Sequence, residues 1–468
     1  MAVDLTRRDF IGAALGASAA ISALGADEAH PQDVGPTART VPLPGGVPGR
    51  ERPNVLFILA DDLGYGDLSC YGRPDYKTPV LDRFATQGLK FTSNYAAAPV
   101  CTPTRCAYIT GRYAQRLPVG LEEPLTNRSP EVGIPDGHPT IAIQLRAAGY
   151  ETALIGKWHL GWKPEFNPVR HGFDEFFGVL SGAVDYFTHA AADAAKSDGG
   201  VAAPDLWENE TRVERDGYLT DLLTDRAVDY IGRKHARPFF LSLQYNAPHS
   251  PWEGPGDAGV DHTDHGPGPM AAGGSLAAYA AIMRSLDSNV GRVLAALKRA
   301  GLERDTLVVF TSDNGGERYS YNWPFSGEKF DLREGGTRVP AIARWPGVIP
   351  ANATTDQPAI TMDWTATILA VAGAAPDPRY PLDGESLLPT LRGERALHER
   401  AFFWRTRTRG AARIGKWKYL QNAEGEHLFD VGVDFGEKAE LKTKLPDVFA
   451  SVKSRYDAWA AEMLPRPT

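Results

Sequence analysis

Four short apolar segments alternate along the chain with longer segments of helical periodicity. The apolar segments are unbroken and rich in β-branched and aromatic residues, as in the buried strands of a parallel sheet. They are Val55–Leu59, Thr152–Ile155, Phe239–Leu243 and Leu307–Thr311. Helices are expected at residues 78–88, 139–149, 217–235 and 276–300, with Thr78 and Ser275 as N-caps. The alternation predicts an α/β sheet covered by helices on both faces.

Ionisable or amide side chains follow the end of each apolar segment. They are, in chain order, Asp61 and Asp62, Lys157 and His159, His249, and Asp313 and Asn314. In open α/β sheets ligands bind outside the carboxyl ends of the strands. One such cluster alone is more often a solvated loop, but four of them predict a single cleft.

A metal site is expected among these residues. Its ligand set contains only oxygen donors, namely Asp61, Asp62, Asp313 and Asn314. Oxygen ligands favour Ca²⁺, with Mg²⁺ as the alternative, whereas zinc would be expected to recruit histidine or cysteine. Neighbouring residues on a strand point to opposite faces, so the strand must end or turn at Asp61 and Asp62. Gly64 and Gly66 provide the freedom for such a turn.

The pentapeptide from Cys101 to Arg105 reads Cys-Thr-Pro-Thr-Arg. Pro103 and Thr104 suit the first turn of a helix, which would place Cys101 at a helix N-terminus that favours an anion. Arg105, Lys157 and Lys329 are the cationic candidates for that anion. Three carboxylates, one divalent cation and three cationic side chains would leave a local charge of about +2, which suits a tetrahedral anion.

Composition narrows the functional classes. The chain has 468 residues, 43% hydrophobic and 23% charged, as in ordinary globular proteins. A formal net charge of −8 without a basic stripe argues against a nucleic-acid-binding protein. The three cysteines, Cys70, Cys101 and Cys106, form no Cys-x-x-Cys pair, which excludes a disulfide scaffold and a cysteine zinc site. Cys70 and Cys106 could pair in the periplasm, but two buried free thiols are expected.

The N-terminal sequence predicts an export signal. Arg7 and Arg8 form a twin-arginine pattern followed by an alanine-rich stretch, and cleavage is expected at Ala26. Residues 1–26 are therefore expected to be a signal peptide for the Tat machinery, and residues 27–52 a linker. No later segment reaches the roughly 18 apolar residues that a membrane span needs. We expect a periplasmic or secreted bacterial protein.

The motifs together resemble the type I, formylglycine-dependent sulfatases of the arylsulfatase group, within the alkaline-phosphatase-like superfamily. The matching segments are residues 53–67, 101–113, 156–161, 247–251, 311–316 and 332–340. The resemblance implies a large mixed, mostly parallel sheet between helices as a catalytic domain at 53–390. It also implies a small C-terminal sheet-plus-helix domain at 391–468.

The resemblance implies hydrolysis of sulfate monoesters, either sulfated carbohydrates or aryl sulfates. A formylglycine-generating enzyme would oxidise Cys101 to the aldehyde formylglycine, whose hydrate attacks sulfur. Asp61, Asp62, Asp313 and Asn314 would bind Ca²⁺ together with the modified Cys101. Asp313 would also take the proton of the nucleophile.

The resemblance also assigns the remaining groups. Arg105 would hold the hydrated aldehyde, and Lys157 and Lys329 would bind sulfate oxygens. His249, with Lys329, would serve the leaving alcohol oxygen. His159 would take the proton from the second hydroxyl, which releases sulfate and regenerates the aldehyde.

Some positions depart from the family pattern or are ambiguous. Thr104 stands where the family more often has serine, and Ser181 aligns one position away from a family serine. The segment Asp261–His265 could hold a second metal, but a solvated loop is favoured because glycine and proline surround it. The tryptophans that could stack on a substrate or fill the core are Trp162, Trp252 and Trp323.

Two other functions compete with a sulfatase. A phosphomonoester or phosphodiester hydrolase on the same fold would be expected to encode Ser or Thr as nucleophile, and its two-metal forms would need further histidine ligands. A non-catalytic protein that binds sulfated glycans would not need acid and base groups such as His159 and His249.

Overall fold

The computed structural model describes residues 52–126, 129–191, 204–259 and 274–467. The expected signal peptide, nearly all of the expected linker and the segment Asp261–His265 lie outside these residues. Among the described helices, none is both long enough and apolar enough to cross a membrane.

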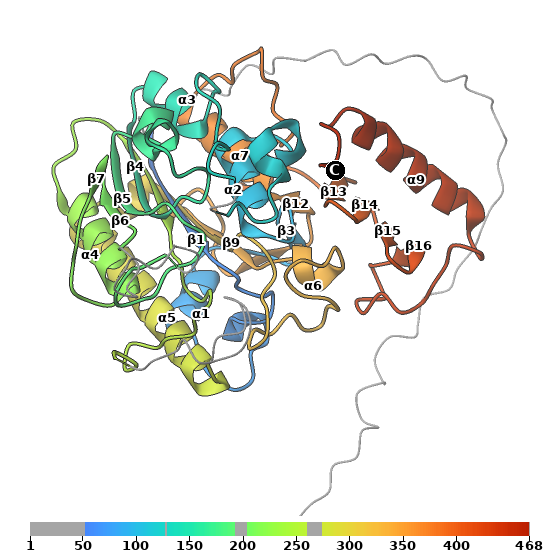
Figure 1. Cartoon of the computed structure of the whole chain (residues 1–468), viewed down its shortest axis with the longest axis horizontal. Coiled ribbons are helices and arrows are strands. Elements are labelled where there is room, and N and C mark those ends of the chain that lie inside the picture. The colour runs from blue at the N-terminus through green and yellow to red at the C-terminus, as the bar shows by residue number, and fades with distance from the viewer. Residues whose placement is uncertain (1–51, 127–128, 192–203, 260–273, 468) are drawn as a thin grey trace, which may run out of the picture. The chain divides into compact units, whose positions relative to one another are not determined.

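Among the described residues, a mixed sheet of ten strands forms the centre of the fold (Figure 1). Across the sheet the strands are β11 (Ala353–Thr355), β2 (Leu89–Phe91), β10 (Ala341–Arg344), β9 (Thr306–Ser312), β1 (Asn54–Ala60), β8 (Phe239–Gln244), β4 (Glu151–Lys157), β5 (Glu175–Val179), β6 (Leu206–Glu208) and β7 (Thr211–Arg212). From β9 to β5 all neighbouring strands are parallel, and antiparallel strands flank them. The four strands predicted from the sequence lie in this parallel centre.

The strand register brings the predicted clusters to one edge of the sheet. Ala60, the last residue of β1, pairs with Ser312, the last residue of β9. Gly156 near the end of β4 pairs with Gln244 at the end of β8. Since parallel strands share a direction, all four carboxyl ends meet there. The four predicted clusters therefore lie at one edge of the sheet, as expected.

Helices cover both faces of the sheet, as predicted. One face carries α1 (Pro79–Thr86), α4 (Leu219–Gly232) and α5 (Leu276–Arg299). The other face carries α2 (Cys101–Thr110), α3 (Ile141–Ala147) and α7 (Thr361–Ala372). Smaller elements are β3 (Asn94–Tyr95), β12 (Ala359–Ile360), α6 (Glu334–Thr337) and α8 (Leu388–Leu391).

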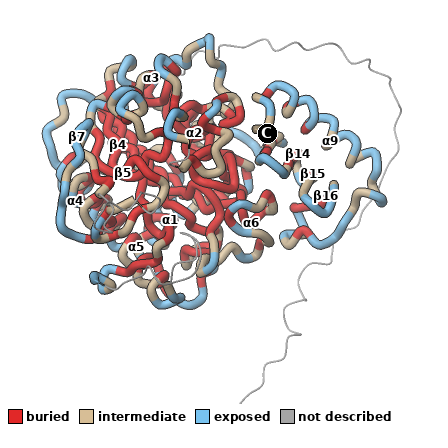
Figure 2. Tube along the Cα trace, viewed as in Figure 1, coloured by how far each residue is buried: buried red, intermediate tan, exposed pale blue. Residues whose placement is uncertain are grey.

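Strand β1 shows how the sheet separates two hydrophobic clusters. Val55 and Phe57 face the cluster of α2, α3 and α7, whereas Leu56 and Ile58 face that of α1, α4 and α5. Successive side chains of a strand point to opposite faces, so an unbroken apolar run is buried on both sides. Figure 2 shows the resulting buried centre. Burying each such side chain contributes about 1.5–3 kcal/mol.

The two predicted N-caps differ. Ser275 accepts a hydrogen bond from the Ala278 N–H at 3.0 Å and caps α5 as expected. Thr78 occupies the N-cap position of α1 but makes no capping bond. Its hydroxyl instead accepts from Ser69 N and donates to Asp82. Thr78 is therefore the N-cap residue as predicted, but its side chain makes no capping bond, because its hydroxyl pairs with Ser69 and with the Asp82 side chain.

A small antiparallel sheet with one long helix follows, as predicted for the C-terminus. Its elements are β13 (Ala401–Arg405), β14 (Gly410–Ile414), β15 (Trp417–Asn422), β16 (Gly425–Asp430) and α9 (Pro446–Ala461). The Trp459 ring of α9 stacks on Phe403 of β13 at 5.4 Å. The Trp404 indole N–H donates to the Ala96 carbonyl at 2.8 Å, which ties this sheet to the segment before α2.

Candidate active site

Cys101 is the first residue of helix α2, as predicted. It is buried, with 1% of its surface exposed. The preceding residue, Val100, is extended and offers no side-chain cap, so the first N–H groups of the helix remain available to a ligand. The Thr104 hydroxyl accepts from the Ala98 N–H and donates to the Ala98 carbonyl, both at 3.0 Å. These two bonds tie Thr104 to Ala98 and so hold the segment on either side of Cys101 in place.

Strand β1 ends at Ala60, and the chain turns at the two aspartates as expected. The left-handed residue is Asp62 itself, with φ of 61°. A non-glycine residue in that conformation costs about 1–3 kcal/mol and is typical of functional sites. The role predicted for Gly64 and Gly66 is wrong, because they instead allow close approach of another loop. A Cβ on Gly64 would lie 2.4 Å from the Ser320 hydroxyl.

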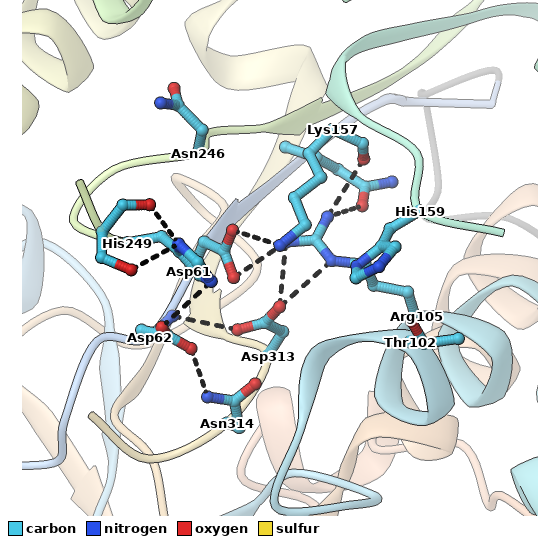
Figure 3. Close-up of polar contacts among 12 residues, drawn as sticks. Asp61, Asp62, Thr102, Arg105, Lys157, His159, Asn246, His249, Asp313 and Asn314 are labelled. Carbon is cyan, nitrogen blue, oxygen red and sulfur yellow. Dashed lines mark hydrogen bonds and ion pairs between the residues drawn. The ribbon is translucent and has the colours of Figure 1, made fainter. Parts of the chain in front are cut away.

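Three cationic side chains pair with three carboxylates in this cleft. Lys157 Nζ lies 2.6 Å from Asp61 Oδ2. Lys329 Nζ lies 2.6 Å from Asp62 Oδ2. Arg105 Nη2 lies 2.9 Å from Asp313 Oδ2. All six side chains are buried. The structure therefore brings together every predicted cation and carboxylate of the site, and Figure 3 shows all of them except Lys329.

The asparagine and the remaining oxygens complete a hard-ligand set. Asn314 Nδ2 donates to Asp62 Oδ1 at 2.7 Å, which orients the amide. The Asn314 Oδ1 and Asp61 Oδ1 atoms are buried without a hydrogen-bond partner in the part of the chain that the structure describes. Cys101, Asp61 and Asp313 offer ligand atoms that lie within 4.8 Å of one another. Buried oxygens without donors fit a Ca²⁺ or Mg²⁺ ion.

The carboxyl groups of the site differ in pKa. Burial raises the pKa of Asp62, but the charges of Lys329, His249 and Lys157 outweigh burial and leave it well below its usual range. Burial, followed by the charge of Asp61, raises the pKa of Asp313 to about 7. Asp313, unlike Asp62, is therefore suited to exchange a proton near neutral pH.

His159 is held as a neutral base. Its backbone is left-handed, with φ of 57°. Its Nε2 lies 2.8 Å from the Leu125 carbonyl, so Nε2 carries the hydrogen and donates. Burial and the charge of Lys157 place its pKa well below the usual value. The Nδ1 atom is buried with no partner among the described residues and carries a free lone pair.

His249 has the opposite arrangement. Its Nδ1 lies 2.5 Å from the Ser250 carbonyl and donates to it. Its Nε2 therefore accepts, and Lys329 Nζ donates to it at 3.1 Å. Burial and the charge of Lys329 lower the pKa of His249 to about 3. Lys329, not His249, holds the proton of this pair.

Several residues of the site were not found from the sequence. Thr102 accepts a hydrogen bond from the Leu125 N–H at 3.0 Å and so supports the loop that holds His159. Gln244, at the end of β8, accepts from Arg105 Nη1 at 2.7 Å. Burial and the charge of Asp62 raise the pKa of Glu317 to about 7. The charge count from the sequence omitted this fourth carboxyl.

The ambiguous residues are also placed. Trp252 is buried at 1% exposure, whereas Trp323 is 59% exposed. The Ser181 N–H donates to Asp205 at 2.7 Å. The next residue, Gly182, lies against His159, because a Cβ added at this glycine would clash with the His159 ring. Cys70 and Cys106 are free thiols, and Cys70 is only partly buried.

Comparison with known proteins gives a consistent result. The sulfatase family model matches residues 53–374. The chain is 34% identical over 443 residues to the N-acetylgalactosamine-6-sulfatase of Canis lupus familiaris, covering 86% of this chain and 81% of that protein. It is 36% identical over 441 residues to the steryl-sulfatase of Mus musculus, covering 78% and 68%.

A solved structure has the same fold. The structure of Ps i-CgsB in complex with k-i-k-neocarrahexaose superposes with a TM-score of 0.77 at 29% sequence identity, covering 88% of this chain and 94% of that one. The matched family segment contains every residue of the cleft, from Asp61 to Lys329. The chain belongs to the sulfatase family and is a sulfuric ester hydrolase with the alkaline-phosphatase-like fold.

Proposed function

We propose that this protein hydrolyses sulfate monoesters with a formylglycine made from Cys101 and one bound Ca²⁺, with Mg²⁺ as the alternative ion. The observation that carries the proposal is the position of Cys101. It lies at the N-terminus of α2, beside Asp61 and Asp313 and close to buried cationic groups. An anion bound there meets free helix N–H groups as well as these cations.

The environment of Cys101 favours a modified residue over a cysteine nucleophile. Burial raises the pKa of the Cys101 thiol to about 11, despite the nearby Lys157 and Lys329 charges. A thiol with that pKa is almost fully protonated at neutral pH and is a poor nucleophile. The hydrated aldehyde would supply a hydroxyl nucleophile and a second hydroxyl through which the enzyme is regenerated.

The cation would be held by Asp61, Asp62, Asp313 and Asn314 together with the modified residue 101. It would supply positive charge next to the reacting sulfate group. Arg105 spans two parts of this site, since it donates to Asp313 and to the Lys157 carbonyl at 3.0 Å. We propose that Arg105 holds both the carboxylate and the nucleophile in place.

Lys157 and Lys329 would bind the sulfate oxygens. Both ammonium groups are buried. Lys157 contacts Asp61 and Lys329 contacts Asp62, and both carboxylates would also bind the cation. A fixed positive charge in a water-excluded site stabilises developing negative charge by about 3–4 kcal/mol per group. Asp313 would take the proton of the nucleophile, because its carboxylate oxygen lies within 4.8 Å of the Cys101 Sγ.

The two histidines would serve different proton transfers, one at the second hydroxyl of residue 101 and one at the leaving alcohol oxygen. His159 presents the lone pair of Nδ1 and would accept the proton of the second hydroxyl. The Lys329–His249 pair would serve the leaving alcohol oxygen. Because His249 Nε2 accepts from Lys329, we propose that the proton for this oxygen comes from the ammonium group.

Substrate and cellular context are also proposals. The relatives are named for N-acetylgalactosamine 6-sulfate and for steryl sulfate, and the similar structure holds a neocarrahexaose. We propose a sulfated carbohydrate or an aryl sulfate as substrate. The twin-arginine pattern supports Tat export to the periplasm or medium after a formylglycine-generating enzyme has acted.

We also propose the domain division expected from the sequence, with a signal peptide at 1–26, a linker at 27–52, a catalytic domain at 53–390 and a C-terminal domain at 391–468. The boundary at residue 390 falls within the short helix α8 (Leu388–Leu391).

The direct test is mass spectrometry of the peptide that carries Cys101. Protein produced with a formylglycine-generating enzyme should give a peptide about 18 Da lighter than the thiol form, as this oxidation requires. The same preparation should release inorganic sulfate from 4-nitrophenyl sulfate and from N-acetylgalactosamine 6-sulfate. An unmodified thiol in fully active enzyme would overturn the proposed mechanism.

The phosphate-ester alternative is tested on the same preparation. Asp61, Asp62 and His249 also lie within 4.8 Å of one another, but His249 Nε2 already accepts from Lys329. We expect 4-nitrophenyl sulfate to be hydrolysed with a higher kcat/KM than 4-nitrophenyl phosphate. The reverse order would favour the phosphatase.

Gly182→Ala is expected to lower kcat for 4-nitrophenyl sulfate about 100-fold. A Cβ at this position would lie 2.4 Å from His159 Cε1 and 2.5 Å from its Nε2. The ring would have to move away from Leu125 and lose its alignment, and a misplaced acid–base group costs about 10²–10⁴-fold in rate. Gly256→Ala is the matched control, since its added Cβ meets no described atom within 4 Å. Equal kcat values for the two variants would contradict the role of His159.

A further inference from the structure

Phe330 is a large apolar side chain at the edge of a site whose other members are buried. Its exposed fraction is 39%, whereas Lys329 and His249 are 4% and 5% exposed. The Lys329 Nζ lies 5.4 Å from the centroid of the Phe330 ring. The ring is therefore next to the Lys329–His249 pair, on the side of the site where the alcohol oxygen of the ester would leave.

The backbone of Phe330 is in an unfavourable conformation. Its φ is 70°, in the left-handed region that a bulky side chain rarely adopts. Such a conformation costs about 1–3 kcal/mol and persists only where the surroundings hold it. With 39% of the side chain exposed, burial of the ring offsets only part of this cost, and the exposed part of the ring remains open to a ligand.

Two hydrogen bonds hold this conformation from opposite sides. The Phe330 N–H donates to the Pro99 carbonyl at 2.8 Å, two residues before Cys101. The Phe330 carbonyl accepts from Arg409 Nη1 at 2.7 Å. Arg409 lies in the turn between β13 and β14 of the C-terminal sheet, and its guanidinium is 3.7 Å from Asp331. The ring is thus fixed relative to both the nucleophile loop and the C-terminal sheet.

We propose that Phe330 is a binding surface for the ring of the alcohol part of the substrate, and that Arg409 is a positioning residue for it. The proposal rests on the proposed function, because it requires a sulfate ester at the Lys329–His249 pair. The face of an aromatic side chain packs against an aryl ring or against the C–H face of a sugar ring. Both substrate classes share this flat apolar face.

The test compares ligands that contain a ring with one that does not. KM is measured for 4-nitrophenyl sulfate and for N-acetylgalactosamine 6-sulfate, and inorganic sulfate supplies a ring-free inhibition constant. In Phe330→Ala we expect KM for at least one ester to rise about 3–10-fold, as the loss of an aromatic contact implies. The inhibition constant of sulfate should change less than about 2-fold, because sulfate meets only the charged groups. The ester whose KM rises identifies the ring as aryl or sugar.

Two further variants separate binding from folding. Phe435→Ala removes another exposed ring, one that packs edge-on against Phe325, and should leave all three constants unchanged. Arg409→Met should raise KM as Phe330→Ala does without lowering kcat, and Arg409→Lys, which can still donate to the Phe330 carbonyl, should restore it.

The outcomes are distinguishable from failure of the proposed function. A wild-type protein that carries the aldehyde at residue 101 but hydrolyses neither ester would refute the function itself. Active wild-type enzyme together with an unchanged KM in Phe330→Ala would overturn the role of Phe330 alone. An equal rise in KM and in the sulfate inhibition constant would also overturn it, since that would mean general damage to the anion site.

Discussion

Cys101→Ser is expected to abolish steady-state turnover, with kcat reduced on the order of 10⁴–10⁶-fold, as for the removal of other catalytic nucleophiles. A serine hydroxyl at the N-terminus of α2 would still lie beside Asp61 and Asp313. It could accept one sulfo group, but a serine ester has no second hydroxyl for His159 to deprotonate. The variant should therefore react at most once.

Rapid mixing of the variant with 4-nitrophenyl sulfate, with nitrophenol release followed over time, tests this prediction. The expected record is a burst of at most one equivalent of nitrophenol, followed by a flat line, and a peptide at residue 101 that carries one sulfo group. Cys70→Ser is the matched control, because Cys70 is a free, partly buried thiol away from the cleft. It should keep wild-type turnover. Repeated turnover by Cys101→Ser would show that the second hydroxyl is not required.

The cleft could be predicted from the sequence because strand ends are local signals. Asp61 and Asp313 each follow an apolar strand directly, and their strands pair from Asn54 with Thr306 to Ala60 with Ser312. Once the strands are recognised as parallel, their carboxyl ends must meet at one edge. The same reasoning brought Lys157 and His249 to that edge without any knowledge of side-chain contacts.

Contacts between loops could not be predicted in this way. The Leu125 carbonyl that fixes the His159 tautomer lies 34 residues from it in the chain, and the Arg409 bond to Phe330 spans 79 residues. Such pairs depend on how irregular segments close over the sheet, and neither periodicity nor propensity encodes that. Thr78 illustrates the same limit, because its hydroxyl bonds to the Ser69 N–H and to the Asp82 carboxylate, and not to a backbone N–H in the first turn of α1.

Lys418→Met is expected to destabilise the folded protein by about 3–5 kcal/mol, the usual cost of removing one partner from a buried ion pair. Lys418 is fully buried on β15 and lies 2.9 Å from Glu334 Oε1 and 3.0 Å from Glu437 Oε1. Glu334 would keep Arg338 at 3.2 Å. Glu437 would be left as a buried carboxylate without a cation.

Urea unfolding followed by tryptophan fluorescence gives the loss as a shift of the midpoint. Lys416→Met is the matched control two residues away, because Lys416 is 56% exposed and pairs with Asp430 at 2.7 Å. An exposed pair contributes about 0–1 kcal/mol, so this variant should unfold close to wild type. A Lys418→Met midpoint equal to that of Lys416→Met would contradict the prediction.

The pH dependence of the same variant identifies the carboxylate responsible. Burial already raises the pKa of Glu437 in the folded protein, although Lys418 opposes the shift, and removing Lys418 raises it further. A carboxyl whose folded pKa exceeds its unfolded pKa takes up a proton on folding, so stability increases as the pH falls toward the unfolded value. The deficit of Lys418→Met should therefore shrink between pH 8 and pH 5. Lys418→Met/Glu437→Gln should be more stable than Lys418→Met at pH 8 and should lose this pH dependence, because a neutral amide at residue 437 needs no buried cation.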